Sequence, residues 1–175
     1  MESTLKNIVL VGPMGSGKTT IGRRLAYELN QKFFDTDHEI IDKTGVTIDH
    51  IFDIEGETGF RQRESKILEN LCQMSNIILA TGGGIVILPK NREILKNAGM
   101  VVYLFSTVDQ LLRRTAKSKT RPLLENSTDR WKTIPELLEA RDVYYREVAS
   151  VIVSTTGKKL HEVINIIKRE TENVD

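Results

Sequence analysis

Short apolar runs alternate along the chain with longer stretches in which apolar residues recur every three or four positions. The runs that predict strands lie at 5–11, 32–34, 76–80, 100–105 and 150–154. The stretches that predict helices lie at 19–30, from about 38, at 47–54, from about 60 to 74, at 89–99, 107–116, 133–148 and from about 158. Five strands joined by helical crossovers predict an α/β fold with a mostly parallel sheet between helices.

Composition and charge narrow the class of protein. The 175 residues carry no repeat and no low-complexity linker, so we expect one domain over 1–175. The 25 basic and 24 acidic residues leave a net charge of +1, which gives no argument for nucleic acid or a membrane as partner. The single cysteine, Cys72, excludes an internal disulfide and a cysteine-rich metal site. With no signal-like start and no apolar run of membrane-spanning length, we expect a cytoplasmic protein.

A glycine-rich motif follows the first predicted strand. The sequence GPMGSGKT at 12–19 matches G-x-x-x-x-G-K-[ST] and lies between a strand and a helix, as a phosphate-binding loop requires. Its backbone N–H groups and the following helix would bind phosphate oxygens, Lys18 would reach the β- and γ-phosphates, and Thr19 would offer its hydroxyl to Mg²⁺. The residues expected at the nucleotide are Gly15, Ser16, Gly17, Lys18, Thr19 and Thr20. The alternative is a glycine-rich turn that binds nothing.

The rest of the chain does not fit the other large classes of phosphate-loop protein. Switch GTPases need a guanine-reading NKxD-type segment, which is absent from the sequence. Motor-type ATPases usually place acids after the third strand, where this chain has Thr81 and three glycines at 82–84.

Two acids follow the second predicted strand instead. Asp35 and Asp37 are two residues apart, and on an extended segment they would point the same way, toward the phosphates. One would support Mg²⁺, largely through water, and the other would orient a substrate hydroxyl. The alternative is that both cap the helix expected from His38. Our candidate metal ligands are Thr19 and Asp35.

The three glycines at 82–84 predict a substrate surface. A strand end without side chains lets a small acceptor lie against the backbone, with an N–H group as donor. A flexible turn before the Pro89 helix is the alternative, and that needs one glycine rather than three.

Several motifs in the same order resemble those of the shikimate kinases, which are small phosphate-loop enzymes related to nucleoside monophosphate kinases. The segments that carry the resemblance are GPMGSGKTTIGR, FFDTDHEI, GETGFRQRE at 56–64, ATGGG, TRPLL at 120–124 and RDVYYREVA at 141–149. The resemblance covers nearly the whole chain and implies a five-stranded parallel sheet of order 2-3-1-4-5. It implies a kinase that phosphorylates the 3-hydroxyl of shikimate with ATP and Mg²⁺, in chorismate and aromatic amino acid biosynthesis, and we expect a monomer.

The resemblance also assigns roles to residues. Asp37 would hold the shikimate ring hydroxyls, Arg61 and Arg141 the carboxylate, and Gly83, between Gly82 and Gly84, would donate its N–H group to the substrate. Paired guanidinium forks suit a planar carboxylate. For each arginine, a solvated helix-surface position is the alternative. The substrate-binding helical region would span about 36–64.

A basic segment with few apolar residues follows the helix at 107–116. Its basic residues are Arg113, Arg114, Lys117, Lys119 and Arg121. Without the resemblance this is a solvated loop; with it, the segment at about 113–126 is a lid that excludes water, with Arg121 at the phosphates and Arg114 near the adenine. Some family members have a nucleotide-contacting glutamine near the last strand, whereas this chain reads STTGKKL at 154–160, so we assign no adenine contact there.

The expected reaction is in-line phosphoryl transfer, in which positioning and electrostatics do most of the catalysis. Lys18, Mg²⁺ and Arg121 would neutralise the growing negative charge, and Asp37 would accept or orient the hydroxyl proton. Two alternatives stay open on sequence grounds: a kinase for another polyol acid such as gluconate, and a nucleotide-binding regulatory module without catalysis.

Overall fold

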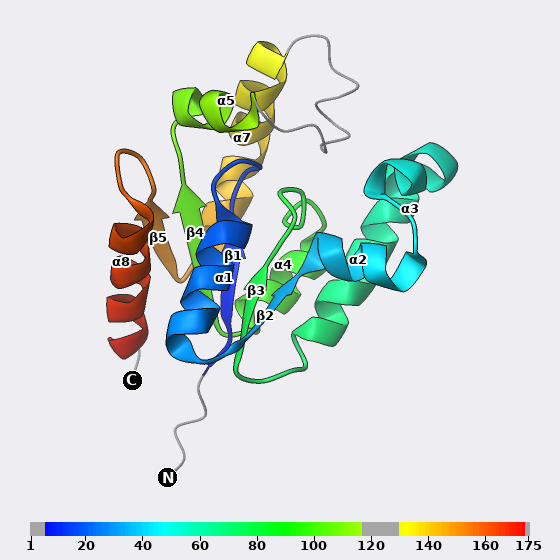
Figure 1. Ribbon diagram of the computed structural model, residues 1–175. Coiled ribbons are helices and arrows are strands. Elements are labelled where there is room, and N and C mark those ends of the chain that lie inside the picture. Colours follow the sequence, from blue (N-terminus) through cyan, green and yellow to red (C-terminus); the bar gives the residue numbers. More distant parts are fainter. Residues whose placement is uncertain (1–5, 117–129, 174–175) are drawn as a thin grey trace.

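The computed structural model describes residues 6–116 and 130–173. Its centre is a five-stranded sheet in the order β2-β3-β1-β4-β5 (Figure 1). All four strand pairings are parallel. The strands are β1 (Ile8–Val11), β2 (Lys32–Asp35), β3 (Ile77–Ala80), β4 (Met100–Phe105) and β5 (Val151–Ser154). The predicted fold class and strand order are confirmed.

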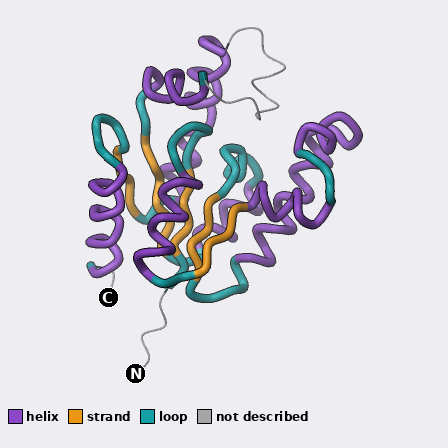
Figure 2. Tube along the Cα trace, in the orientation of Figure 1, coloured by secondary structure: helices purple, strands orange, loops and turns teal. Residues whose placement is uncertain are grey.

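Helices cover both faces of this sheet (Figure 2). They are α1 (Lys18–Leu29), α2 (Thr36–Thr44), α3 (Ile48–Leu71), α4 (Pro89–Lys96), α5 (Val108–Thr115), α7 (Arg130–Val148) and α8 (Leu160–Glu172). Successive residues of a strand point to opposite faces, so each strand contributes to two cores. Ile8 and Leu10 of β1 pack with α1 and α8, whereas Val9 and Val11 pack with α3, α4 and α7.

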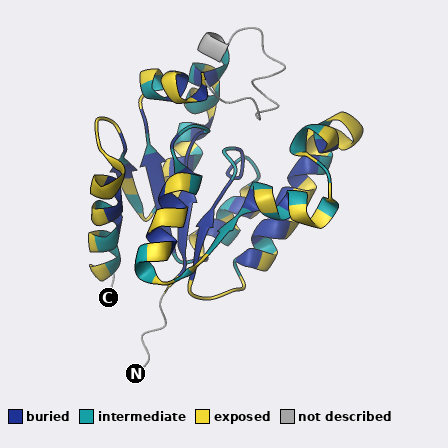
Figure 3. Ribbon diagram, in the orientation of Figure 1, coloured by how far each residue is buried: buried dark blue, intermediate teal, exposed yellow. Residues whose placement is uncertain are grey.

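The sheet interior is almost completely removed from solvent (Figure 3). Each residue of β1 and β3 is at most 3% exposed, as expected of parallel strands with helices on both faces. This rigid platform holds the loops that follow the strands. Because β1 lies between β3 and β4, the chain leaves the carboxyl end of β1 at the point where the strand order changes direction, which is where such sheets bind ligands.

Several element boundaries differ from the sequence expectation. The helix expected from about 38 begins at Thr36, because the Asp35 side chain accepts hydrogen bonds from the N–H groups of Asp37 and His38 and starts the helix directly after β2. The helices expected at 47–54 and from about 60 are one run, α3, with a non-helical kink at Gly56 (φ 68°, ψ −176°). The first strand begins at Ile8 rather than at residue 5.

The expected lid at 113–126 is described only as far as Ala116, so Arg121 lies outside the described residues. Within the part of the chain that is described, no helix is both long enough and apolar enough to cross a membrane.

Candidate active site

A cavity of about 660 Å³ lies at the carboxyl edge of the sheet. Its walls come from the loop after β1, the start of α2, both segments of α3, the turn after β3 and the helices α5 and α7. Lys18, Arg61 and Arg141 all line it, so residues distant in sequence meet at one hollow. The volume is in the range of small-molecule sites.

The loop after β1 has the conformation of a phosphate cradle. Gly12, Gly15 and Gly17 adopt φ values of 149°, 83° and 92°, which side-chain-bearing residues rarely adopt. The ammonium group of Lys18 donates to the backbone oxygens of Gly12 at 2.7 Å and Pro13 at 2.8 Å. The lysine therefore lies across the loop, with its side chain mostly buried, and the N-terminus of α1 begins at the same point.

The two candidate metal ligands are in contact with each other. The Thr19 hydroxyl donates to Oδ2 of Asp35 at 2.7 Å, which places two hard oxygen donors side by side at the cavity wall. Mg²⁺ binds through one or two protein oxygens plus phosphates and water, so this pair fits the ion. The described residues contain no cluster of three or more acidic, histidine or cysteine side chains that could hold a metal without such extra ligands.

Asp35 and Asp37 are separated into different roles by the start of α2. Asp35 combines the capping that we considered as an alternative with its contact to Thr19. Asp37 lies in the first helical turn, so the alternation of an extended strand is the wrong reason for their common direction. Both nevertheless line the cavity.

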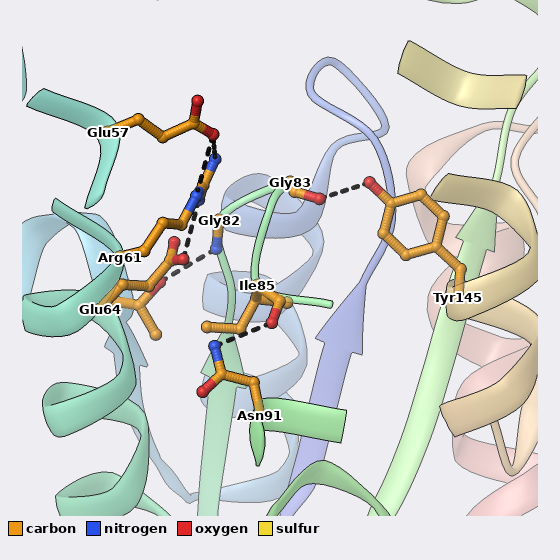
Figure 4. A network of polar contacts seen from close by, with 9 residues as sticks. Glu57, Arg61, Glu64, Gly82, Gly83, Ile85, Asn91 and Tyr145 are labelled. Carbon is orange, nitrogen blue, oxygen red and sulfur yellow. Dashed lines mark hydrogen bonds and ion pairs between the residues drawn. The ribbon is translucent and has the colours of Figure 1, made fainter. Parts of the chain in front are cut away.

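Arg61 is held inside the site by two acids of its own helix. Its Nη1 donates to Oε1 of Glu64 at 2.8 Å, and its Nε and Nη2 lie 3.4 and 3.3 Å from Oε1 of Glu57 (Figure 4). Arg61 is 7% exposed, so the solvated helix-surface alternative is wrong for this residue. Arg141 is 6% exposed, so the solvated helix-surface alternative is wrong for it as well.

Glu64 is a site residue that the sequence analysis missed. It is fully buried, and its Oε2 has no hydrogen-bond partner among the described residues. Burial raises the pKa of the carboxyl to about 6, Asp37 adds to the rise, and Arg61 and Arg141 oppose it. Its position three residues after Arg61, inside the segment at 56–64, could have revealed it as a helical ion-pair partner.

The three glycines after β3 each lie under a charged side chain of the site. None of them has a positive φ, so backbone conformation does not explain them. A Cβ on Gly84 would lie too close to the Arg61 guanidinium for both to keep their places, and one on Gly82 would lie 2.8 Å from Oε2 of Glu64. A Cβ on Gly83 would lie 3.6 Å from Nη1 of Arg141. The bare backbone therefore lets the protein's own charged groups converge, in addition to leaving room for a ligand.

The same turn is fixed by hydrogen bonds on several sides (Figure 4). The Gly82 N–H donates to Oγ1 of Thr36 at 3.0 Å, so it is already used within the protein. The Gly82 oxygen accepts from the Ile85 N–H, and Asn91 donates to the Ile85 oxygen at 3.0 Å. Within the described part of the chain, the N–H groups of Gly83 and Gly84 donate no hydrogen bond.

An apolar wall that the sequence analysis did not identify completes the cavity. Phe52 and Phe60 have ring centroids 4.8 Å apart and, with Ile48, line the side formed by α3. An apolar wall of this kind suits a carbocyclic ring between polar groups.

The nucleotide side shows two further contacts. Nη1 of Arg114 donates to the Gly15 oxygen at 3.1 Å, and burial lowers the pKa of this arginine. Gln110 of α5 donates to the Thr155 oxygen at 3.2 Å, so a glutamine does reach the segment after β5, but from another helix. No spacing pattern in the sequence indicates that Gln110 approaches this segment.

Almost all of the expected site residues that the structure describes line the one cavity. Those on its wall are Gly15, Gly17, Lys18, Thr19, Thr20, Asp35, Asp37, Arg61, Gly82, Gly83, Gly84, Arg114 and Arg141. Ser16 does not line it; this residue is buried within the loop and its hydroxyl lies 3.4 Å from the Lys18 ammonium.

Comparison with known proteins agrees with this arrangement. The family model described as shikimate kinase matches residues 14–172. A shikimate kinase of Nitrosococcus oceani is 52% identical over 94% of this chain and 86% of that protein. One of Thioalkalivibrio sulfidiphilus is 50% identical over 93% and 85%.

Solved structures extend the likeness to the fold. The structure titled shikimate kinase from Acinetobacter baumannii in complex with shikimate has a TM-score of 0.94 and 45% identity, over 98% of this chain and 96% of that one. Shikimate kinase from Aquifex aeolicus has a TM-score of 0.81 and 34% identity, over 95% and 96%. Sequence, fold and the residues around the cavity agree, and the chain belongs to the shikimate kinase family.

Proposed function

We propose that this chain transfers the γ-phosphoryl group of ATP to the 3-hydroxyl of shikimate, giving shikimate 3-phosphate and ADP. The observation that carries the proposal is that one cavity joins the Lys18 loop to Arg61 and Arg141. A triphosphate on the loop and a hydroxy acid on the arginines would then meet in the same hollow. This arrangement supports a kinase more strongly than a nucleotide-binding module, which needs no second site.

The acceptor side suits a cyclic hydroxy acid. A guanidinium group has five N–H donors, and three of those of Arg61 are used by Glu57 and Glu64, so two remain within the described contacts for a carboxylate. Asp37 would accept from ring hydroxyls, and the aromatic wall of α3 would cover one face of the ring. Arg141 would provide the second fork for the carboxylate.

The phosphate side has the groups that the reaction requires. Backbone N–H groups of residues 15–19, the Lys18 ammonium and the start of α1 would bind the phosphates. Thr19 and Asp35 would hold Mg²⁺, which when bound to ATP neutralises charge on the β- and γ-phosphates. Arg121, which belongs to the undescribed part, keeps its sequence-based assignment to the transferring phosphoryl group.

Asp37 is the group that would act on the acceptor hydroxyl. Its carboxylate can hold the hydroxyl in line with the γ-phosphoryl group and take the proton as the bond to phosphorus forms. Glu64 and Asp37 lie close enough for their charges to interact, and Arg61 and Arg141 offset part of this repulsion. The chain would therefore hold the Asp37 carboxyl group beside two cations at the wall of the cavity.

A coupled assay of ADP formation with and without shikimate tests the proposal. We expect ADP release that depends on both shikimate and Mg²⁺, with phosphate found on the 3-hydroxyl by NMR. Gluconate and quinate serve as other acid polyols. If gluconate were the better acceptor, the reaction class would stand and the substrate would be wrong; if no acceptor stimulated ADP release, the kinase proposal would fail.

A further inference from the structure

Tyr145 is a buried residue to which the reaction outlined above gives no role. It lies on α7 one turn after Arg141, and no part of its side chain is exposed. Its hydroxyl donates to the Gly83 oxygen at 2.5 Å across 62 residues of sequence (Figure 4). A buried tyrosine hydroxyl needs a partner, but packing alone does not require that partner to be the turn that faces the substrate.

The hydrogen bond to the Gly83 oxygen also sets the direction of the Gly84 N–H group. A peptide group is planar and trans, so the Gly83 oxygen and the Gly84 N–H point in opposite directions from the same plane. Holding the oxygen on the α7 side therefore directs the Gly84 N–H away from Tyr145. The preceding peptide, which carries the Gly83 N–H, is held through the Gly82 oxygen and the Ile85 N–H.

Without a Cβ, this turn has little of its own to prevent a peptide flip. Glycine has access to conformations that other residues avoid, so in three successive glycines no side chain restrains the backbone. The carbonyl bond from Tyr145 supplies the restraint that side chains on the turn would otherwise give. A flip at 83–84 would place an oxygen where a donor to an acidic substrate is needed.

Tyr145 also contacts the arginine on the same helix. The Arg141 guanidinium lies near enough to the tyrosine hydroxyl to lower its pKa, and this hydroxyl can accept from a guanidinium while it donates to Gly83. Burial raises the pKa of Tyr145 to about 12, and Arg141 opposes this rise. The hydroxyl therefore keeps its proton at neutral pH and remains a donor to the turn.

We infer that Tyr145 is a positioning residue for the acceptor: its hydroxyl holds the Gly83–Gly84 peptide and the Arg141 guanidinium in one fixed arrangement. Two groups proposed to meet shikimate, one on the turn and one on α7, are thereby set relative to each other by a single oxygen atom. This inference rests on the proposed function, because it assigns Tyr145 to binding of the acid acceptor and not of ATP.

The matched control is Tyr103, a second buried tyrosine whose ring packs against the ring of Tyr145. Tyr103 of β4 is also fully buried, its ring centroid lies 5.1 Å from that of Tyr145, and its hydroxyl donates to Asp142 at 2.6 Å. Replacement of either tyrosine by phenylalanine removes one buried hydroxyl and keeps the ring. Only Tyr145 contacts the glycine turn through its hydroxyl.

The test compares Tyr145→Phe with Tyr103→Phe in steady-state kinetics and in calorimetric titrations with shikimate. We expect Tyr145→Phe to raise the KM and Kd for shikimate about tenfold and to change the KM for ATP less than about twofold. Tyr103→Phe should leave both KM values within about twofold. Each titration is normalised to the fraction that binds ATP, so a loss of folded protein is not counted as a loss of shikimate affinity.

Equal shikimate affinities for the two variants would overturn the inference, as would equal changes in the KM for shikimate and ATP. A double-mutant cycle with Arg141→Lys gives an independent measure: the combined effect on the KM for shikimate should be smaller than the product of the single effects. If the effect of the double variant on the KM for shikimate equalled the product of the two single effects, coupling between Tyr145 and Arg141 would be excluded. If the wild-type protein released no ADP in response to shikimate, the proposed function itself would fail.

Discussion

Glu64 and Arg61 form a buried ion pair one helical turn apart, with 2.8 Å between Oε1 and Nη1. The other carboxylate oxygen of Glu64 has no hydrogen-bond partner among the described residues. Desolvation of this carboxylate outweighs the attraction of Arg61, since the pKa is raised to about 6 in spite of the pair. Burial of the ionised carboxylate therefore costs stability, and the attraction of Arg61 offsets only part of that cost.

The first prediction concerns the pH dependence of folding. Because the folded pKa of Glu64 is about 6, above its unfolded value of 4.5, the folded state binds the proton more tightly. Its contribution to stability is therefore present below pH 4.5 and is lost as the pH rises to about 6, a change of about 2 kcal/mol. Glu64→Gln should lack this loss. Urea unfolding from pH 4 to 7.5 measures it, and parallel curves for both proteins would contradict the assignment.

The second prediction concerns Asp37. Asp37→Asn should lower kcat at least about 100-fold, because an amide cannot take the hydroxyl proton, and should leave the KM for ATP within about threefold. Asp42→Asn, at an exposed position of the same helix, is the control. An equal loss of turnover and of ATP affinity would show that Asp37 serves the nucleotide instead.

The third prediction concerns the second guanidinium group. Arg141→Lys keeps the charge and loses the fork, so the KM for shikimate should rise about tenfold or more while the KM for ATP stays nearly constant. The exposed Arg146 of the same helix gives a matched Arg146→Lys control. A selective effect on ATP would remove Arg141 from the carboxylate clamp.

The fourth prediction concerns the oxygen pair at the proposed magnesium site. Thr19→Val removes the hydroxyl that contacts Asp35, so half-maximal activity should need several-fold more Mg²⁺. Thr19→Ser keeps the hydroxyl and should behave like the wild type. Identical magnesium titrations for the valine and serine variants would place the ion elsewhere.

The fifth prediction separates the three glycines. Gly84→Ala should abolish detectable shikimate binding and retain ATP binding, because a Cβ there would force the Arg61 guanidinium out of its place. Gly83→Ala should be milder, since its nearest contact would be the Met14 nitrogen at 3.3 Å. Calorimetric titration with each substrate distinguishes the two, and the reverse order of severity would contradict the packing argument.

Periodicity in the sequence is enough to predict the sheet, because parallel strands covered on both faces read as short apolar runs such as 76–80. The helix α2 starts two residues earlier than expected. Asp35 accepts from the N–H groups of Asp37 and His38, so the helix begins where a loop was expected. The kink at Gly56 was expected as a break between two helices, and a single glycine proved sufficient for it.

Lys18, which was expected from its motif, and Arg61, which was expected from the family resemblance, both line the cavity. Glu64 and Tyr145 were missed for a different reason: each acts on another residue of the protein, and such contacts depend on tertiary packing. The sequence pattern predicts which helix face carries Glu64 and Tyr145, but it does not predict which residues they contact.

The floor of the cavity at 82–84 is made of peptide groups, with charged side chains packed directly above them. The N–H groups of Gly83 and Gly84 donate no hydrogen bond among the described residues, so an inhibitor could be anchored on them. Such an inhibitor would contact peptide groups, which every amino acid carries. A replacement of Gly84 that repels the drug would also displace the Arg61 guanidinium. Drug resistance at this floor should come at the expense of the natural reaction, which makes it a favourable point of attack.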